Sequence, residues 1–189
     1  HRGFLRRSTS RAWTRGAAGY GARLTLSDGD IETGLGFIDR AIGREPDRAD
    51  AHNVRGRLWM AQEQYHRAIL SFDRAIELDP SFAWAWNNKG YVHLLTGRYE
   101  EAADALETAV GLSPATAYMH NNLGLAYEGI GLQREAEAAF SEALALRPQY
   151  VNAMVNMERI RENETAVAEV EGQGPKERED GSLDFVPGG

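Results

Sequence analysis

Apolar and small residues recur along this chain with a period of 34 residues. When each unit is numbered so that a proline falls at position 32, large apolar side chains fall at position 24 and alanines fall at positions 20 and 27. Position 24 holds Ile38, Phe72, Leu106 and Phe140; position 20 holds Ala68, Ala102 and Ala136; position 27 holds Ala41, Ala75, Ala109 and Ala143. A fixed period of this length is typical of stacked helical hairpins.

Glycine and proline divide each unit into two helices. Glycine recurs at position 8 and position 15, and the prolines close the units; the residues are Gly56, Gly90 and Gly124, then Gly29, Gly97 and Gly131, then Pro46, Pro80, Pro114 and Pro148. Position 15 supplies a left-handed residue after a first helix, and proline cannot continue a second. Small residues at positions 8, 20 and 27 predict closely packed helices.

Two segments carry a family resemblance at nearly every signature position. They are WNNKGYVHLLTGRYEEAADALETAVGLSP, from Trp86 to Pro114, and HNNLGLAYEGIGLQREAEAAFSEALALRP, from His120 to Pro148. The chain resembles the tetratricopeptide repeat family over about residues 15–163. The resemblance implies an all-α fold, a right-handed α-solenoid of antiparallel helix pairs whose first helices line a concave groove.

The repeat register predicts the domain organisation. A basic segment, 1–14, precedes an array over 15–163, and an acidic, Gly-rich tail over 164–189 is expected to be disordered. The array divides into a degenerate repeat, 15–48, three full repeats, 49–82, 83–116 and 117–150, and a capping helix, 151–163. Each hairpin needs its neighbours to cover its apolar face.

Composition and charge restrict the function classes. Residues 1–23 carry six arginines and no acid, whereas residues 24–157 carry a net charge of −8, so the array would repel nucleic acid. The basic start is typical of a fragment or processed end, a targeting segment, or an arm for an anionic partner. The chain has no cysteine, no complete signal peptide, and no stretch apolar enough to span a membrane. These features leave the compartment and the oligomeric state open.

Asparagine recurs on the predicted first helices. Position 6 holds Asn88, Asn122 and Asn156, and position 5 holds Asn53, Asn87 and Asn121. An asparagine amide both donates and accepts hydrogen bonds, so a row of them can hold a peptide backbone of any sequence. We therefore predict an asparagine ladder that binds an extended peptide or partner segment, and the resemblance implies the same role.

Aromatic residues are expected beside this ladder. Positions 2 and 9 share a helical face with positions 5 and 6, and they hold Trp84, Tyr118 and Tyr91. These residues are predicted to form side-chain pockets, although Trp84 at an inter-repeat position is also typical of ordinary core. Some family members clamp an acidic chaperone tail through lysine or arginine at positions 2, 5 or 6. Those cations are missing here, so neutral or apolar ligand side chains are expected.

The sequence favours a non-enzymatic scaffold without metal or cofactor. Its histidines do not cluster: His52 and His120 share one repeat position two units apart, and His93 is expected to be a partly buried packing residue. Phosphate-loop, HExxH and GxSxG motifs are absent. Two alternatives remain. The array could be a structural subunit that uses its convex face or ends, or the repeat module of a longer enzyme such as a glycosyltransferase.

Overall fold

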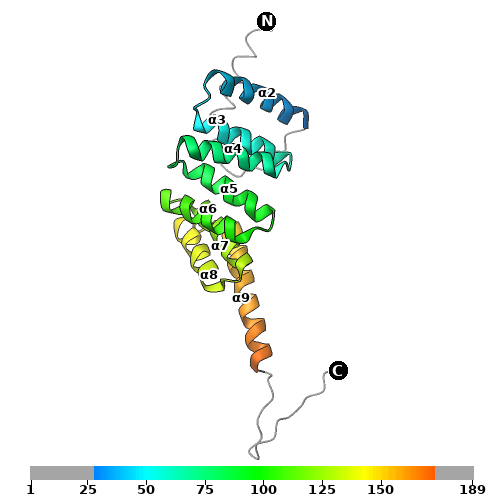
Figure 1. Cartoon of the computed structure of the whole chain (residues 1–189). Helices are drawn as coiled ribbons and strands as arrows, with labels where there is room; N and C mark the ends of the chain where they lie inside the picture. Colours follow the sequence, from blue (N-terminus) through cyan, green and yellow to red (C-terminus); the bar gives the residue numbers. More distant parts are fainter. Residues whose placement is uncertain (1–27, 173–189) are drawn as a thin grey trace, which may run out of the picture.

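The chain between residues 28 and 172, which the computed structural model describes, is a stack of helices without a strand. Side-chain surroundings are described from residue 30 to residue 163. The helices are α2 (Asp28–Arg44), α3 (Ala49–Ala61), α4 (Tyr65–Leu78), α5 (Ala83–Leu95), α6 (Tyr99–Leu112), α7 (Ala117–Ile130), α8 (Gln133–Leu146) and α9 (Val151–Gly172). They stack in chain order into an elongated array, with α2 at one end and α9 at the other (Figure 1). The prediction of an all-α solenoid is confirmed.

Contacts between helices follow the repeat. The helices of each full repeat pack most extensively on each other, as α3 on α4, α5 on α6 and α7 on α8. The second helix of each repeat then packs on the first helix of the next. First helices also touch one another directly, since α5 contacts both α3 and α7, and α7 contacts α9. The first helices therefore form a continuous row, which we call the first-helix face.

Most helix ends between α2 and α8 lie where the sequence places them, but Gly29, expected in a turn, lies in the first turn of α2. The second helices α2, α4, α6 and α8 all stop two residues before their prolines. Gly97 and Gly131, which follow first helices, have φ angles of 70° and 90°. At both turns the next backbone N–H donates to a carbonyl five residues earlier, Arg98 to His93 and Leu132 to Tyr127, each at 2.9 Å. This is the Schellman arrangement that a left-handed glycine permits.

Glu63 occupies the same turn position without being glycine. Its φ is 59°, and Gln64 N donates to Trp59 O at 2.9 Å, as in the glycine-containing turns. A side chain in the left-handed region costs about 1 to 2 kcal/mol because Cβ approaches a carbonyl oxygen. The repeat geometry therefore imposes this conformation on Glu63.

Glu63→Gly is expected to stabilise the array. The strain relieved exceeds the extra chain entropy that glycine brings to the unfolded state, so the free energy of unfolding should rise by about 0.5 to 1 kcal/mol. Urea unfolding followed by circular dichroism measures the change. Gln62→Gly is the control, because Gln62 has a φ of −90° and glycine there brings only the entropic cost. If Glu63→Gly is no more stable than Gln62→Gly, the strain is absent.

The glycines at position 8 permit close helix contact. A Cβ added at Gly56 or Gly124 would lie 2.5 Å from the ring of the position-24 phenylalanine of the same hairpin, and one at Gly90 would lie 2.6 Å from Leu106 Cγ. These separations are shorter than van der Waals contact, so a larger residue would push the hairpin apart. The pairing of position 8 with position 24 thus explains why both recur.

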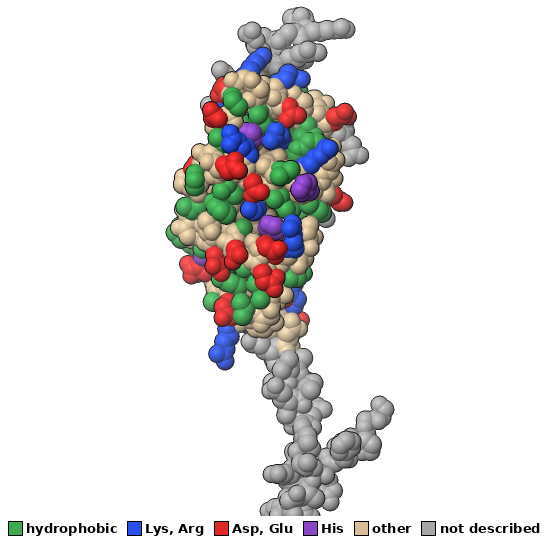
Figure 2. Space-filling view, in the orientation of Figure 1, with side chains coloured by type: hydrophobic (Ala, Val, Ile, Leu, Met, Phe, Trp, Pro, Cys, Tyr) green, Lys and Arg blue, Asp and Glu red, His purple; other side chains and the backbone are tan. Residues whose placement is uncertain are grey.

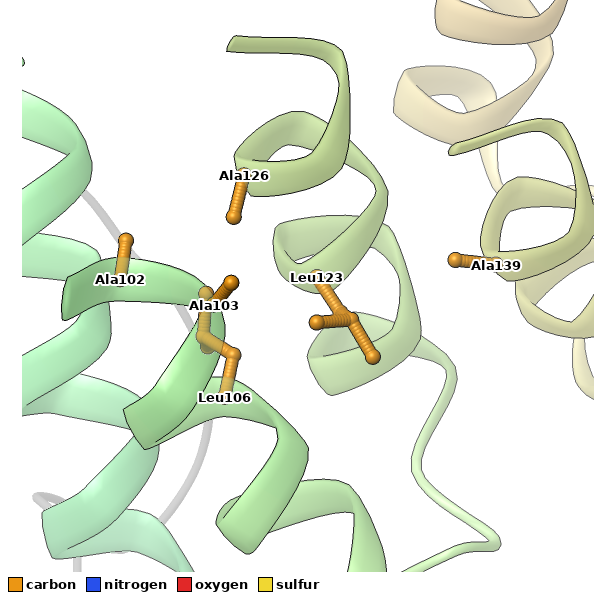
Figure 3. Close-up of a cluster of buried hydrophobic side chains, with 6 residues drawn as sticks. All are labelled: Ala102, Ala103, Leu106, Leu123, Ala126 and Ala139. Atoms are coloured by element: carbon orange, nitrogen blue, oxygen red, sulfur yellow. The ribbon is translucent and has the colours of Figure 1, made fainter. Parts of the chain in front are cut away.

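Small and large side chains alternate in the buried seam between hairpins. Ala102, Ala103 and Leu106 of α6 face Leu123 and Ala126 of α7 (Figure 3). The alanines at positions 20 and 27 of the three full repeats are fully buried. Close approach at these alanines lets neighbouring hairpins interlock.

The first helix of each full repeat is also tied to the proline turn before it. Nε2 of His52 and Nε2 of His120 lie 2.8 Å from the carbonyl oxygens of Pro46 and Pro114. Trp86, at the same repeat position, donates its indole N–H to Pro80 O at 3.0 Å. A carbonyl only accepts, so Nε2 of each histidine carries the proton. These two histidines therefore hold the chain at the turn.

The last helix extends beyond the expected capping segment. The pattern ended it at residue 163, whereas α9 continues to Gly172 and projects from the array (Figure 1). The extra residues, Glu164 to Gly172, include two alanines and three glutamates, which have high helix propensity. The predicted basic segment, 1–14, the first helix of the degenerate repeat and the rest of the predicted tail lie outside the described residues.

Candidate functional site: the first-helix face

The predicted asparagines meet in pairs between consecutive repeats. Each amide at position 6 donates from Nδ2 to Oδ1 of the position-5 asparagine in the preceding repeat. The distances are 2.8 Å from Asn88 to Asn53, 3.1 Å from Asn122 to Asn87 and 3.0 Å from Asn156 to Asn121. Three equivalent hydrogen bonds therefore link α3 to α5, α5 to α7 and α7 to α9.

Most of these amides are buried. Asn87 is 0%, Asn122 2% and Asn121 3% exposed, and only Asn88 is half-buried. A buried amide must find its partners inside the protein, so the ladder first fixes one first helix against the next. Ligand contact by the ladder stays a prediction, and Asn88 is the member best placed to make it.

A signal for this pairing was present in the sequence. The series of asparagines at position 6 is offset by one repeat from the series at position 5. Position 6 of the first full repeat is Val54, and position 5 of α9 is Val155. Asn53 and Asn156 are thus the single asparagines at the two ends of the series. This staggering is expected when position 6 pairs with position 5 of the preceding repeat.

The predicted aromatic residues lie together on the same face. Trp84 of α5 and Tyr118 of α7 are stacked, with ring centroids 6.4 Å apart and an interplanar angle of 27°. Both side chains are half-buried, as is Tyr91 on α5. Stacked aromatic rings that keep part of their surface in solvent offer a large contact area at small entropic cost.

Tyr118 of this pair and the neighbouring Arg57 are partly shielded from water. Burial raises the pKa of the Tyr118 phenol, while a hydrogen bond from Asn122 opposes the rise. Burial also lowers the pKa of Arg57, and the nearby Tyr118 opposes that change. Arg159, at the same repeat position as Arg57, forms an ion pair with Glu128. The face near Trp84 therefore combines aromatic surface with the charge of Arg57.

Metal and membrane features are lacking in the part of the chain that the structure describes. Among residues 28–172, no three histidine, aspartate or glutamate side chains are placed to hold one metal ion. No helix in the same range is both long and apolar enough to cross a bilayer.

A row of first helices joined by buried amide pairs, with aromatic side chains on its open face, defines a helical-repeat scaffold for protein interaction. The chain belongs to the tetratricopeptide repeat family, whose profile matches residues 22–81, 60–117 and 88–151. A search among curated proteins found no match.

Solved structures share the fold. MamA from Desulfovibrio magneticus RS-1 is 25% identical, with a TM-score of 0.65, and the alignment covers 89% of this chain and 94% of that one. The first TPR of Spaghetti (RPAP3), bound to the HSP90 peptide SRMEEVD, is 19% identical, with a TM-score of 0.61 and coverage of 62% and 94%. The second TPR domain of human RPAP3, in complex with the HSP70 peptide SGPTIEEVD, is 26% identical, with a TM-score of 0.57 and coverage of 58% and 92%.

Proposed function

We propose that this chain binds an extended segment of a partner protein along its first-helix face. The stacked pair Trp84–Tyr118 carries the proposal, because exposed aromatic surface beside the half-buried Asn88 combines a side-chain anchor with a backbone contact. Two structurally similar repeat domains have peptides bound, which supports a peptide as the ligand class. The function is capture of a partner rather than catalysis.

The chemistry of the face favours neutral or apolar ligand side chains. The two peptides bound by the RPAP3 domains end in Glu-Glu-Val-Asp, and acidic ends of this kind call for several cations. Positions 2, 5 and 6 of the full repeats carry none; they hold Asp50, Asn53, Val54, Trp84, Asn87, Asn88, Tyr118, Asn121 and Asn122.

The backbone contacts are assigned mainly to Asn88. Its Nδ2 donates to Asn53 and its Oδ1 accepts from Asn87 at 3.4 Å, which leaves a second N–H and one further oxygen lone pair for a ligand amide. The buried asparagines Asn87, Asn121 and Asn122 hold the helices that carry the aromatic anchors. Tyr91, the residue after Gly90, lies on the same helix as Asn88, α5. It extends the side-chain contact surface.

Trp84→Ala and Tyr118→Ala are expected to weaken peptide binding at least tenfold each. A buried aromatic anchor contributes about 2 kcal/mol or more to a peptide interface, and tenfold corresponds to about 1.4 kcal/mol. Peptides are selected from a random phage-displayed library on the wild-type chain, synthesised with a fluorophore and titrated by anisotropy. Asn88→Ala should weaken the same peptides about three- to tenfold through lost hydrogen bonds.

Leu70→Ala is the matched control, because Leu70 is 56% exposed on a second helix, α4. It should leave the affinity unchanged, and circular dichroism must show all variants folded. If peptides bind folded Trp84→Ala and Tyr118→Ala as tightly as wild type while Leu70→Ala loses them, the second-helix side is the docking surface. The first-helix proposal is then refuted, and the scaffold works through its outer face.

A further inference from the structure

A groove opens between the second helices α4 and α6, with α5 as its floor. Its volume is about 820 Å³, which is within the range of ligand-binding clefts. Apolar surface comes from Tyr65, Ile69, Trp86 and Ala105, and polar groups include His93. We call this feature the α4–α6 groove. It is separate from the stacked aromatic pair of the first-helix face, neither of whose residues lines it.

The equivalent gap one repeat later is filled by the chain itself. Adding 34 to the floor residues of the groove, Lys89, His93 and Thr96, gives Leu123, Tyr127 and Ile130. Leu123 is buried in a cluster with residues of α6 and α8, and Tyr127 and Ile130 pack against that cluster. Tyr127 also packs against the buried cluster of α8 and α9. An aromatic side chain therefore occupies the space between α6 and α8.

Side-chain size and direction explain the difference between the gaps. The imidazole of His93 extends less far from the backbone than the phenol of Tyr127. Thr96 is likewise smaller than its repeat equivalent, Ile130. Lys89 does not fill the space, because its Nζ lies 2.7 Å from Asp73 Oδ1. Asp73 is the repeat equivalent of Glu107, which accepts a hydrogen bond from the Tyr127 hydroxyl at 2.9 Å. The same carboxylate position thus pairs with a lysine in one gap and with a phenol in the other.

His93 is left with an unmet hydrogen-bonding requirement. The residue is 6% exposed and its Nδ1 has no hydrogen-bond partner. Burial lowers the pKa of the His93 imidazole, and the charges of Arg98 and Lys89 lower it further, so the ring is neutral near pH 7. Buried polar atoms are paired in almost all native structures. At the floor of the groove, an imidazole with one unpaired nitrogen thus stands where the filled gap has a hydrogen-bonded phenol.

From these observations we propose that the α4–α6 groove is a second binding site, which accepts a tyrosine side chain of a partner protein. The neighbouring gap supplies the template, since it holds a tyrosine ring between two second helices with its hydroxyl on a polar group. The apolar walls fit the ring, and Asp104 and Thr108 offer partners for the hydroxyl. The charged residues that line the groove are two cations, Lys89 and Arg98, and two acids, Glu101 and Asp104, so the lining matches a neutral guest better than an ion.

The outer surface beside the groove is acidic. Figure 2 shows Asp and Glu side chains gathered over α6 and α8, and the exposed acids there include Glu100, Glu101, Asp104 and Glu107. A partner segment that carries the tyrosine and flanking basic residues would complement this surface. The groove and the first-helix face together would let one repeat array hold two partner segments.

The test uses p-cresol, the tyrosine side chain without its backbone. It is titrated into the ¹⁵N-labelled full chain, and amide shifts of His93, Thr96 and Glu101 are followed by NMR. A dissociation constant on the order of 1 mM is expected for a ligand of this size. Toluene, which lacks the hydroxyl, should bind at least about threefold more weakly, and n-butylammonium should not shift these amides.

Two variants distinguish the groove from non-specific surface binding. His93→Tyr introduces the residue type of Tyr127, which occupies the gap between α6 and α8. It should weaken p-cresol binding at least tenfold. Thr96→Ile, at an exposed position, should weaken p-cresol binding about threefold or more. It is the substitute test if His93→Tyr does not fold. Leu70→Ala is the control that should leave binding unchanged. The proposal is overturned if folded variants bind p-cresol like wild type, or if n-butylammonium binds more tightly than p-cresol.

Discussion

Ala136→Phe is expected to lower the free energy of unfolding by about 3 kcal/mol or more. Ala136 of α8 is 0% exposed and lies in a cluster with Phe140, Met157 and Ile160, so a benzyl group has no space there. Overpacking of a dense core costs about 1 to 3 kcal/mol, and sometimes more. The loss spreads because each hairpin is stabilised by its neighbours. Thermal and urea unfolding should both record it, with a melting temperature lowered by roughly 10 °C.

Ala138→Phe is the control for this overpacking. Ala138 lies two residues away on the same helix but is exposed, so its variant should unfold within about 0.5 kcal/mol of wild type. Ala102→Phe, at the same repeat position as Ala136, should behave like Ala136→Phe. Equal melting temperatures for all three variants would refute the repeat register on which the fold assignment rests.

Asn122→Ala is expected to destabilise the array by about 2 kcal/mol. It removes the 3.1 Å hydrogen bond to Asn87 and leaves a buried oxygen on a residue that is 0% exposed. An orphaned buried polar group costs about 1 to 3 kcal/mol, more than the net value of the bond itself. Asn152→Ala, at an exposed position of α9, removes only a surface hydrogen bond to Tyr150 and should change the stability by no more than about 0.5 kcal/mol.

A double-mutant cycle separates pairing from packing at this site. Asn87→Ala, Asn122→Ala and the double variant are unfolded in urea, and a coupling energy of about 0.5 to 3 kcal/mol is expected for contacting groups. Because loss of an inter-repeat pair also disturbs the helices that carry Trp84 and Tyr118, ladder variants alone are a poor test of peptide binding. A coupling energy near zero would contradict the pairing of these amides.

The sequence predicted which asparagines share the first-helix face but not how they connect. The sequence placed Asn53, Asn87, Asn88, Asn121, Asn122 and Asn156 on one row because helical periodicity and the 34-residue period together fix which positions face the same way. It did not say whether those amides reach a ligand or one another. That depends on the distance and rotation between successive first helices, which the packing of whole hairpins sets.

The sequence by itself determined the repeat, the helix ends at the regularly spaced prolines and at Gly97 and Gly131, and the small-residue contacts. These follow from local chemistry, because proline stops a helix, glycine permits a positive φ, and a residue without a side chain admits a neighbouring ring. Only the tertiary structure decided the remaining features. It imposed a left-handed turn on Glu63, buried the asparagine pairs and opened the α4–α6 groove. Each of these features results from contacts between side chains of different repeats. The groove is open, for example, because His93 is smaller than its repeat equivalent, Tyr127.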